Sequence, residues 1–213
     1  LEVWALIDDF THREDNGVDP QEILSYTSKR TAIIEVLMSE ADRCGFDGIN
    51  VDFEKVTEDG SQDYIQFIRE LSLKCANNGI VLSVDNYPPT AYTAFYNRSE
   101  QAVFADYVIL MGYDEHYAGS EEAGSVSSIG FVNQGVADTL QSVPADQLIL
   151  GMPFYTRVWS ETPVSDDGAA VSTTEDTSDS DTLYELDCYS AGMKEVQNLI
   201  STNGAVPVWS DTD

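Results

Sequence analysis

Basic side chains are scarce in this sequence of 213 residues, which has 10 Lys and Arg against 38 Asp and Glu and a formal net charge of −28. Non-specific binding of nucleic acid needs a basic surface, so we expect no nucleic-acid partner. There is also no apolar run of about 18 residues, the length that a transmembrane helix needs, and we expect no membrane insertion. The opening LEVWALIDDF lacks the basic region of a signal peptide. The acidic excess is most simply explained as a solubilising surface.

Cysteine is also scarce, with three residues at Cys44, Cys75 and Cys188. Their number is odd, their spacing is wide and no CxxC pair occurs, so a zinc site of the usual spacing is excluded. Cys44 and Cys75 fall late in predicted helices, which favours buried free thiols, while a disulfide is left open. We expect no metal and no cofactor.

Short apolar runs alternate with helical patterns along the chain. Strands are predicted at 3–8, 46–54, 79–87, 106–114 and 147–155, and helices at 20–43, 61–77, 90–101 and 127–142. Asp19 before Pro20 is a predicted N-cap, and Gly45 and Gly79 stand where helices should end. Strands that alternate with helices of this length indicate βαβ units and a parallel sheet.

Polar residues gather where these strands end. They are Asp8, Asp9, Asp52, Glu54, Asp85, Asn86, Tyr87, Tyr113, Asp114, Glu115, Tyr155 and Arg157. The loops at the carboxyl ends of parallel strands build the active site of a (β/α)8 barrel, and they also bind the ligand of an open doubly wound sheet. The sequence therefore predicts a functional site at this edge.

The stretch GFDGINVDFEKV (45–56) alternates polar and apolar side chains, as a strand with two different faces does. We expect Asn50, Asp52 and Glu54 to face the barrel interior, and the other face to pack under helices through Ile49, Val51 and Phe53. Neighbouring carboxylates raise one another's pKa, and a carboxyl that stays protonated is a general acid. A single aspartate there would more simply cap a strand end. Three inward polar residues beside several tyrosines favour catalysis.

Three stretches of the sequence resemble glycoside hydrolase family 18, the chitinase-like enzymes. DGINVDFE (47–54) is similar to the DGxDxDxE motif, LMGYDEH (110–116) to the Met-x-Tyr-Asp of the sixth strand, and ILGMPFYTRVW (149–159) to the Gly-x-Pro-x-Tyr-x-Arg of the seventh. VWALIDDF and YDEHYAGS resemble the bacterial branch associated with cell walls and spores. The resemblance implies a truncated (β/α)8 TIM barrel with five βα units. Residues 1–159 would be the catalytic core. Residues 160–213 would be a polar loop and a small α+β insertion of the same domain, after the penultimate barrel strand.

The resemblance also implies a retaining, substrate-assisted mechanism, in which the acetamido oxygen of an N-acetylglucosamine unit attacks its own anomeric carbon. Glu54 protonates the leaving oxygen and later activates water, Asp52 holds the acetamido N–H, and Tyr113 hydrogen-bonds the acetamido carbonyl. Further substrate contacts are implied for Asn50, Met111, Asp114, Tyr155 and Arg157, with core packing as the alternative for Met111. The implied partner is a β-1,4-linked polysaccharide, peptidoglycan first and chitin second. The protein would be extracellular or bound to the cell wall or spore.

Two features depart from the family pattern. Asn50 stands where many chitinases have Asp, and we expect its amide to bind Asp52 and keep that carboxyl more readily ionised than in an Asp–Asp pair. The resemblance also places two barrel strands before Leu1 and one after Asp213. The tryptophan of the family's last strand would then be absent, with Trp209 in the insertion, and open sheet edges would favour self-association. A lectin without turnover, or an inactive fragment, are the alternatives to a glycosidase.

Overall fold

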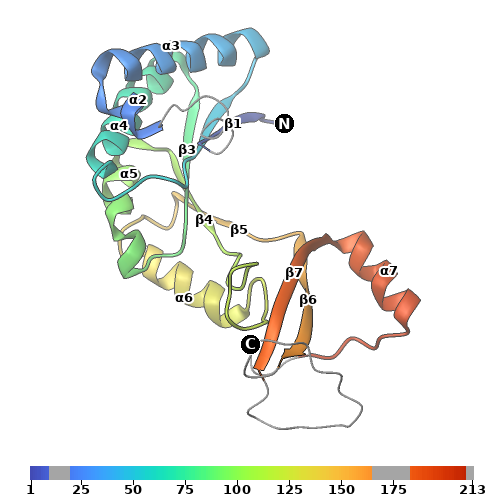
Figure 1. Ribbon diagram of the computed structural model, residues 1–213. Coiled ribbons are helices and arrows are strands. Elements are labelled where there is room, and N and C mark those ends of the chain that lie inside the picture. Colours follow the sequence, from blue (N-terminus) through green and yellow to red (C-terminus); the bar gives the residue numbers. More distant parts are fainter. Residues whose placement is uncertain (10–19, 165–182, 210–213) are drawn as a thin grey trace. The chain divides into compact units, whose positions relative to one another are not determined.

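The computed structural model describes residues 1–9, 20–164 and 183–209. The chain forms two compact units: residues 1–111 with 133–151, and residues 112–132 with 152–213 (Figure 1).

The first unit contains a parallel sheet of five strands in the order β1-β2-β3-β4-β5. Every strand pairs with the next one along the chain, as repeated βα units produce. The five strands fall inside the five ranges predicted from the sequence, which confirms that prediction. They are β1 (Trp4–Asp8), β2 (Gly48–Asp52), β3 (Val81–Asn86), β4 (Tyr107–Met111) and β5 (Leu148–Gly151).

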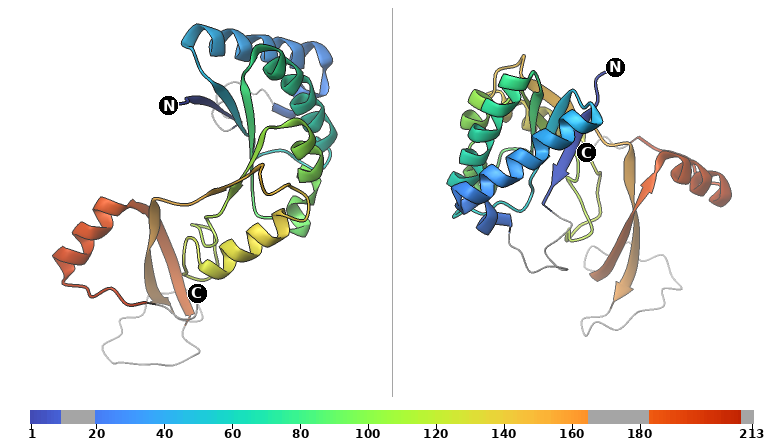
Figure 2. Two further views of the ribbon diagram at one scale, coloured as in Figure 1. Left: turned by 180° about the vertical axis from the view of Figure 1, so that it is seen from behind. Right: turned by 90° about the horizontal axis from the view of Figure 1, so that it is seen from above.

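The helices of this unit follow the strands in turn and cover one face of the sheet (Figure 2). They are α2 (Pro20–Ser25), α3 (Thr27–Cys44), α4 (Ser61–Asn78), the 3-10 helix η1 (Ala91–Tyr96) and α5 (Arg98–Phe104). Helix α6 (Ile129–Thr139) begins in the part of the chain assigned to the second unit and ends in the part assigned to the first. Pro20 opens α2 as predicted, and the predicted N-cap Asp19 lies outside the described residues. Gly45 and Gly79 end α3 and α4 in the left-handed conformation that favours glycine, as expected.

The core lies between α4 and the sheet. Ile49, Val51 and Phe53 are 1%, 0% and 5% exposed, so the predicted outward face of β2 is confirmed. The Phe53 ring stacks on Phe67 of α4, with 5.6 Å between the ring centroids. Full burial of side chains of this size contributes roughly 1.5–3 kcal/mol each, which pins the register of β2 and thereby turns its polar residues to the other face.

Gly48 begins β2 at a point where no side chain fits. A Cβ built there would lie 2.6 Å from Trp4 Cδ1 and 2.7 Å from Cγ, because the indole covers this glycine. The same indole stacks on Tyr107, with 5.6 Å between the ring centroids. The glycine of the DGINVDFE stretch therefore lets Trp4 of β1 reach Tyr107 of β4 across β2 and β3.

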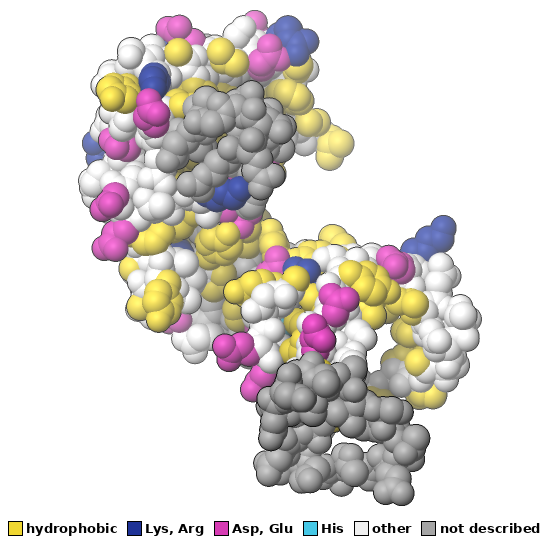
Figure 3. Space-filling model, in the orientation of Figure 1, with side chains coloured by type: hydrophobic (Ala, Val, Ile, Leu, Met, Phe, Trp, Pro, Cys, Tyr) yellow, Lys and Arg dark blue, Asp and Glu magenta, His cyan; other side chains and the backbone are white. Residues whose placement is uncertain are grey.

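The surface carries the acidic excess of the sequence. Asp and Glu side chains are spread over the face drawn in Figure 3, with few Lys and Arg between them. No helix in the described parts of the chain has the length and apolarity that crossing a bilayer requires.

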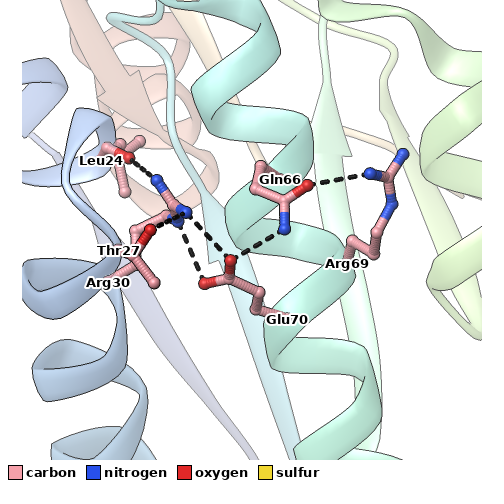
Figure 4. Close-up of polar contacts among 6 residues, drawn as sticks. All are labelled: Leu24, Thr27, Arg30, Gln66, Arg69 and Glu70. Atoms are coloured by element: carbon pink, nitrogen blue, oxygen red, sulfur yellow. Dashed lines mark hydrogen bonds and ion pairs between the residues drawn. The ribbon is translucent and has the colours of Figure 1, made fainter.

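The predicted helix at 20–43 is wrong as a continuous element, because Tyr26 is extended (φ −109°, ψ 124°) and separates α2 from α3. Arg30 holds the break, since its Nη1 donates to the Leu24 carbonyl at 2.6 Å (Figure 4). Its Nε and Nη2 donate to the two carboxylate oxygens of Glu70 on α4, each at 3.0 Å. Arg30 is 6% exposed, so this fork-to-fork pair ties both helices to α4 from the inside.

The predicted helix at 90–101 is also divided. Asn97 adopts φ 50°, ends η1, and precedes α5. The exposure of Cys44 contradicts its predicted burial, whereas Cys75 is buried, and all three cysteines are free.

The second unit contains an antiparallel pair that the sequence did not predict. Strand β6 (Tyr155–Val164) pairs with β7 (Leu183–Gly192), from Tyr155 opposite Gly192 to Val164 opposite Leu183. Helix α7 (Met193–Asn203) follows β7. The expected boundary at residue 160 falls within β6, and most of the predicted polar loop, residues 165–182, lies outside the described residues.

Candidate active site

Two neighbouring strands of the first unit place their polar residues side by side. Asn50 on β2 is paired in register with Ser83 on β3, and Val51 with Val84. Paired residues of parallel strands point to the same face, at a strand spacing of about 4.8 Å. The same register, continued past Val51 and Val84, puts Asp52 beside Asp85 and Glu54 beside Tyr87 on this face, and the hydrogen bond between Tyr87 and Glu54 agrees with it. We call these three rungs the inner ladder; its members are Asn50, Ser83, Asp52, Asp85, Glu54 and Tyr87.

The first rung is closed by the amide of Asn50. Its Nδ2 donates to Ser83 Oγ at 3.0 Å and to Asp85 Oδ1 at 2.9 Å, and the residue is 8% exposed. The expectation that this amide binds Asp52 is therefore wrong. The reason is the register, which places two acceptors on β3 within reach of the Asn50 amide.

The second rung joins two carboxyl groups with raised pKa values. Burial raises the pKa of Asp52 to about 7, and Asp85, Glu54 and the aspartates at the end of β1 add to the rise. Burial also raises the pKa of Asp85 to about 6, although the hydrogen bond from Asn50 opposes this. Asp52 Oδ1 is buried and has no hydrogen-bond partner among the described residues. The Asn50 amide donates to Asp85 and so does not stabilise the Asp52 anion, and the expectation that Asp52 ionises more readily than in an Asp–Asp pair stays a prediction.

The third rung holds Glu54. Its Oε2 accepts a hydrogen bond from the Tyr87 hydroxyl. Its backbone N–H donates to Asp9 Oδ1 at 3.0 Å, and the next N–H, of Lys55, donates to Asp9 Oδ2 at 2.8 Å. Asp9 is 7% exposed and fixes the backbone where β2 ends. Among the described residues, no Lys or Arg forms an ion pair with Glu54.

The sequence placed Asp9, Asp85 and Tyr87 at strand ends but gave none of them a role. The period-2 pattern of SVDNY (83–87), continued past the end of β3, was the signal that could have identified two of them, since Ser83, Asp85 and Tyr87 alternate as Asn50, Asp52 and Glu54 do. Met111, the remaining expected site residue of this unit, ends β4 and is 4% exposed. Its contact with a substrate stays a prediction.

The other expected residues lie in the second unit, where three of them form one cluster. Asp114 Oδ1 accepts hydrogen bonds from the Tyr155 hydroxyl at 2.7 Å and from Arg157 Nη2 at 2.6 Å. Asp114 has φ 58°, a conformation rare outside glycine and typical of functional sites when other contacts hold it. The ring of Tyr113 meets that of Tyr155 edge-on, with 6.2 Å between centroids.

The charges of this cluster support one another. The hydrogen bond to Asp114 raises the pKa of Arg157, and burial together with Asp114 raises the pKa of Tyr155. Arg157 Nη1 also donates to Ser190 on β7 at 3.0 Å, so the β6–β7 pair fixes the guanidinium. Among the described His, Cys, Asp and Glu side chains, no group of three is arranged to hold a metal ion.

The profile described as glycosyl hydrolases family 18 matches residues 16–212. The chain belongs to glycosyl hydrolase family 18.

Individual members of family 18 resemble the chain over most of its length. The cortical fragment-lytic enzyme of Bacillus subtilis is 30% identical over 141 residues, 63% of this chain and 32% of that protein. A chitinase of Chromobacterium violaceum superposes with a TM-score of 0.75 at 22% identity, over 99% of this chain and 60% of the other. The spore cortex-lytic enzyme SleL of Bacillus megaterium gives a TM-score of 0.75 at 15% identity, over 99% and 45%.

These structural likenesses establish the fold class of the family 18 chain as the (β/α)8 barrel, here in truncated form, and the described residues supply five of its parallel strands, as predicted. The chain spans 32% to 48% of the length of the curated relatives it matches.

Proposed function

We propose that this family 18 chain carries the acid of a glycosidase that cuts β-1,4-linked polymers containing N-acetylglucosamine. Glu54 is the general acid and base of a retaining, substrate-assisted reaction. The observation that carries the proposal is the setting of Glu54 on the inner ladder. A neutral hydroxyl binds its carboxyl, a carboxyl of raised pKa is its neighbour, and no described cation holds it as an anion.

The reaction has two steps in this proposal. In the first, Glu54 gives its proton to the glycosidic oxygen while the acetamido oxygen of the substrate attacks the anomeric carbon. The bond to the leaving sugar breaks and a cyclic oxazolinium ion forms. In the second, Glu54 takes a proton from water, which attacks the same carbon and restores the acetamido group. Asp52 accepts a hydrogen bond from the acetamido N–H and, when ionised, stabilises the positive charge of the oxazolinium ion.

The second rung of the inner ladder suits that role of Asp52. The pKa of Asp52 is raised to about 7 and that of Asp85 to about 6, so between these pH values the two carboxyls together hold one proton and one negative charge. Asn50 favours the charge on Asp85 in the empty site, because its amide donates there. An acetamido N–H arriving at the unpartnered Asp52 Oδ1 would draw the charge to Asp52.

The substrate is proposed from chemistry and from the relatives together. The names of the relatives include cortical fragment-lytic and spore cortex-lytic enzymes, and also a chitinase. Peptidoglycan is our first substrate and chitin the second, and the site of action is the cell wall or spore of a bacterium. Roles in sugar binding for Asn50, Met111, Tyr113, Asp114, Tyr155 and Arg157 stay predictions.

The test is release of 4-methylumbelliferone from its tri-N-acetylchitotrioside by the complete gene product. Glu54→Gln keeps the shape of the side chain and removes the acid, so we expect release to fall about 10²- to 10⁴-fold while binding of the oligomer is retained. Glu58→Gln, at an exposed glutamate four residues further on, is the matched control. Undiminished release by Glu54→Gln would falsify the assignment. Binding without release by the wild type would identify a lectin instead.

A second assay separates the two polymers. Purified peptidoglycan and chitin are digested in parallel and the products are weighed by mass spectrometry. Products from chitin alone would make chitin the substrate and remove peptidoglycan from first place.

A further inference from the structure

Tyr87 makes a contact that the reaction above does not use. The residue directly follows β3, and its hydroxyl donates to Glu54 Oε2 across the third rung of the inner ladder. Burial raises the pKa of Tyr87, and the hydrogen bond to Glu54 raises it further. Both effects favour the neutral phenol, which is the form that donates to Glu54.

The backbone of Tyr87 is held by a buried cation. Arg98 is 6% exposed, and its Nη2 donates to the Tyr87 carbonyl at 2.8 Å while Nη1 donates to the Thr93 carbonyl at 3.0 Å. None of the ion pairs among the described residues includes Arg98. Burial without a counter-ion lowers the pKa of Arg98 to about 10. Burying the Arg98 guanidinium costs free energy, and its hydrogen bonds to the two carbonyls offset that cost. These hydrogen bonds therefore fix the segment that follows β3.

The ring of Tyr87 is held by a second tyrosine. Tyr96 meets it edge-on, with 6.3 Å between ring centroids and 80° between planes. The Tyr96 hydroxyl donates to the Phe53 carbonyl at 3.0 Å, directly before Glu54. Tyr96, 2% exposed, thus contacts the Tyr87 ring and the carbonyl directly before Glu54, and so links the two segments that carry the hydrogen bond.

We propose that Tyr87 is the positioning residue of Glu54. Its hydroxyl keeps the Glu54 carboxyl in one rotamer and occupies Oε2 as an acceptor, so that Oε1 carries the proton that is transferred. Arg98 and Tyr96 hold Tyr87 in place. The inference rests on the function proposed above in one respect, the use of Glu54 as the acid.

The first experiment detects the contact without turnover. A hydroxyl proton in a strong buried hydrogen bond exchanges slowly and resonates far downfield in the proton NMR spectrum. We expect one such signal in the wild type, its loss in Tyr87→Phe, and a changed chemical shift in Glu54→Gln, where an amide replaces the carboxyl. Tyr92→Phe, at a tyrosine on η1 that is 89% exposed, is the matched control and keeps the signal. A signal that is absent, or that ignores Glu54→Gln, overturns the inference.

The second experiment measures the consequence for proton delivery. A sugar needs protonation to leave, whereas 4-methylumbelliferone leaves with less help. Tyr87→Phe should therefore reduce kcat about tenfold more on tetra-N-acetylchitotetraose than on the umbelliferyl trioside, within the 10²- to 10⁴-fold that an acid contributes. KM should change little. Equal losses on both substrates would show that Tyr87 only supports the fold, and would overturn the inference.

The two arms separate failure of the inference from failure of the function. A wild type that shows the Tyr87 proton and its response to Glu54→Gln, yet cleaves neither substrate, refutes the glycosidase and leaves Tyr87 as the residue that holds Glu54. A wild type that cleaves both substrates, with Tyr87→Phe impaired equally on both, leaves the glycosidase and refutes the positioning role.

Discussion

Replacement of Asp85 by asparagine should make the protein more stable at alkaline pH. The pKa of Asp85 is raised from 3.8 to about 6 in the folded state. A raised pKa means that the folded state holds the proton more tightly than the unfolded state does. The stabilising contribution of protonated Asp85 is therefore complete below about pH 4 and is lost as the pH rises through about 6. The asparagine of the variant does not titrate, and its amide oxygen can still accept the hydrogen bond from Asn50.

The size of the effect follows from the two pKa values. Their difference of about 2 corresponds to about 3 kcal/mol as an upper limit, at 1.36 kcal/mol for each factor of ten in the proton affinity. The carboxyl keeps some contact with solvent, and Asp52 beside it readjusts its own protonation. We therefore expect Asp85→Asn to raise the free energy of unfolding by about 1–2 kcal/mol at pH 8 and to leave it nearly unchanged at pH 4.5.

Urea denaturation of wild type and variant at about six pH values between 4.5 and 8 measures this difference. Asp59→Asn is the matched control, because it removes one negative charge from an exposed turn without touching the inner ladder. If the wild type becomes more stable from pH 5 to 8, or if Asp85→Asn and Asp59→Asn give the same pH dependence, the account of the second rung is wrong.

Three further predictions concern the scaffold. Gly48→Ala should lower the free energy of unfolding by about 1–3 kcal/mol, since its Cβ displaces Trp4; tryptophan fluorescence in urea measures this, and an unchanged midpoint would contradict it. Arg30→Met should cost about 3 kcal/mol, because Glu70 loses its buried cation; the same titration applies, and a cost below about 1 kcal/mol would show that the pair is dispensable. The thiol of Cys75, whose pKa burial raises to about 12, should react with Ellman's reagent only after unfolding, whereas the exposed Cys44 should react in the native chain; fast labelling of all three cysteines of the native chain would refute the burial of Cys75.

The elements of the first unit could be predicted because their signals are local. Apolar runs of strand length, an αL glycine at Gly45 and another at Gly79, and the alternation around Val51 are all visible without knowledge of the fold. The break at Tyr26 is not visible in the same way. The helical pattern runs through it, and the helix is divided by Arg30, whose acceptors are the Leu24 carbonyl and a carboxylate on another helix.

The inner ladder was predictable on one strand only. The inward direction of Asn50 and Glu54 follows from the pattern of β2 alone. Their partners depend on the register of β2 against β3, which a single sequence does not state, so the amide of Asn50 was assigned to the wrong aspartate. The β6–β7 pair was missed for another reason, because a polar stretch of low complexity separates its two strands.

The hydrogen bond between Asn50 and Asp85 has a consequence for engineering. An amide and a carboxylate of equal size face each other across 2.9 Å on neighbouring strands. Exchanging them, through Asn50→Asp with Asp85→Asn, transposes one negative charge between strands and leaves volume, net charge and hydrogen-bond count unaltered. The negative charge that acts on Asp52 can therefore be moved from one neighbouring strand to the other by a pair of compensating substitutions, in evolution or in design.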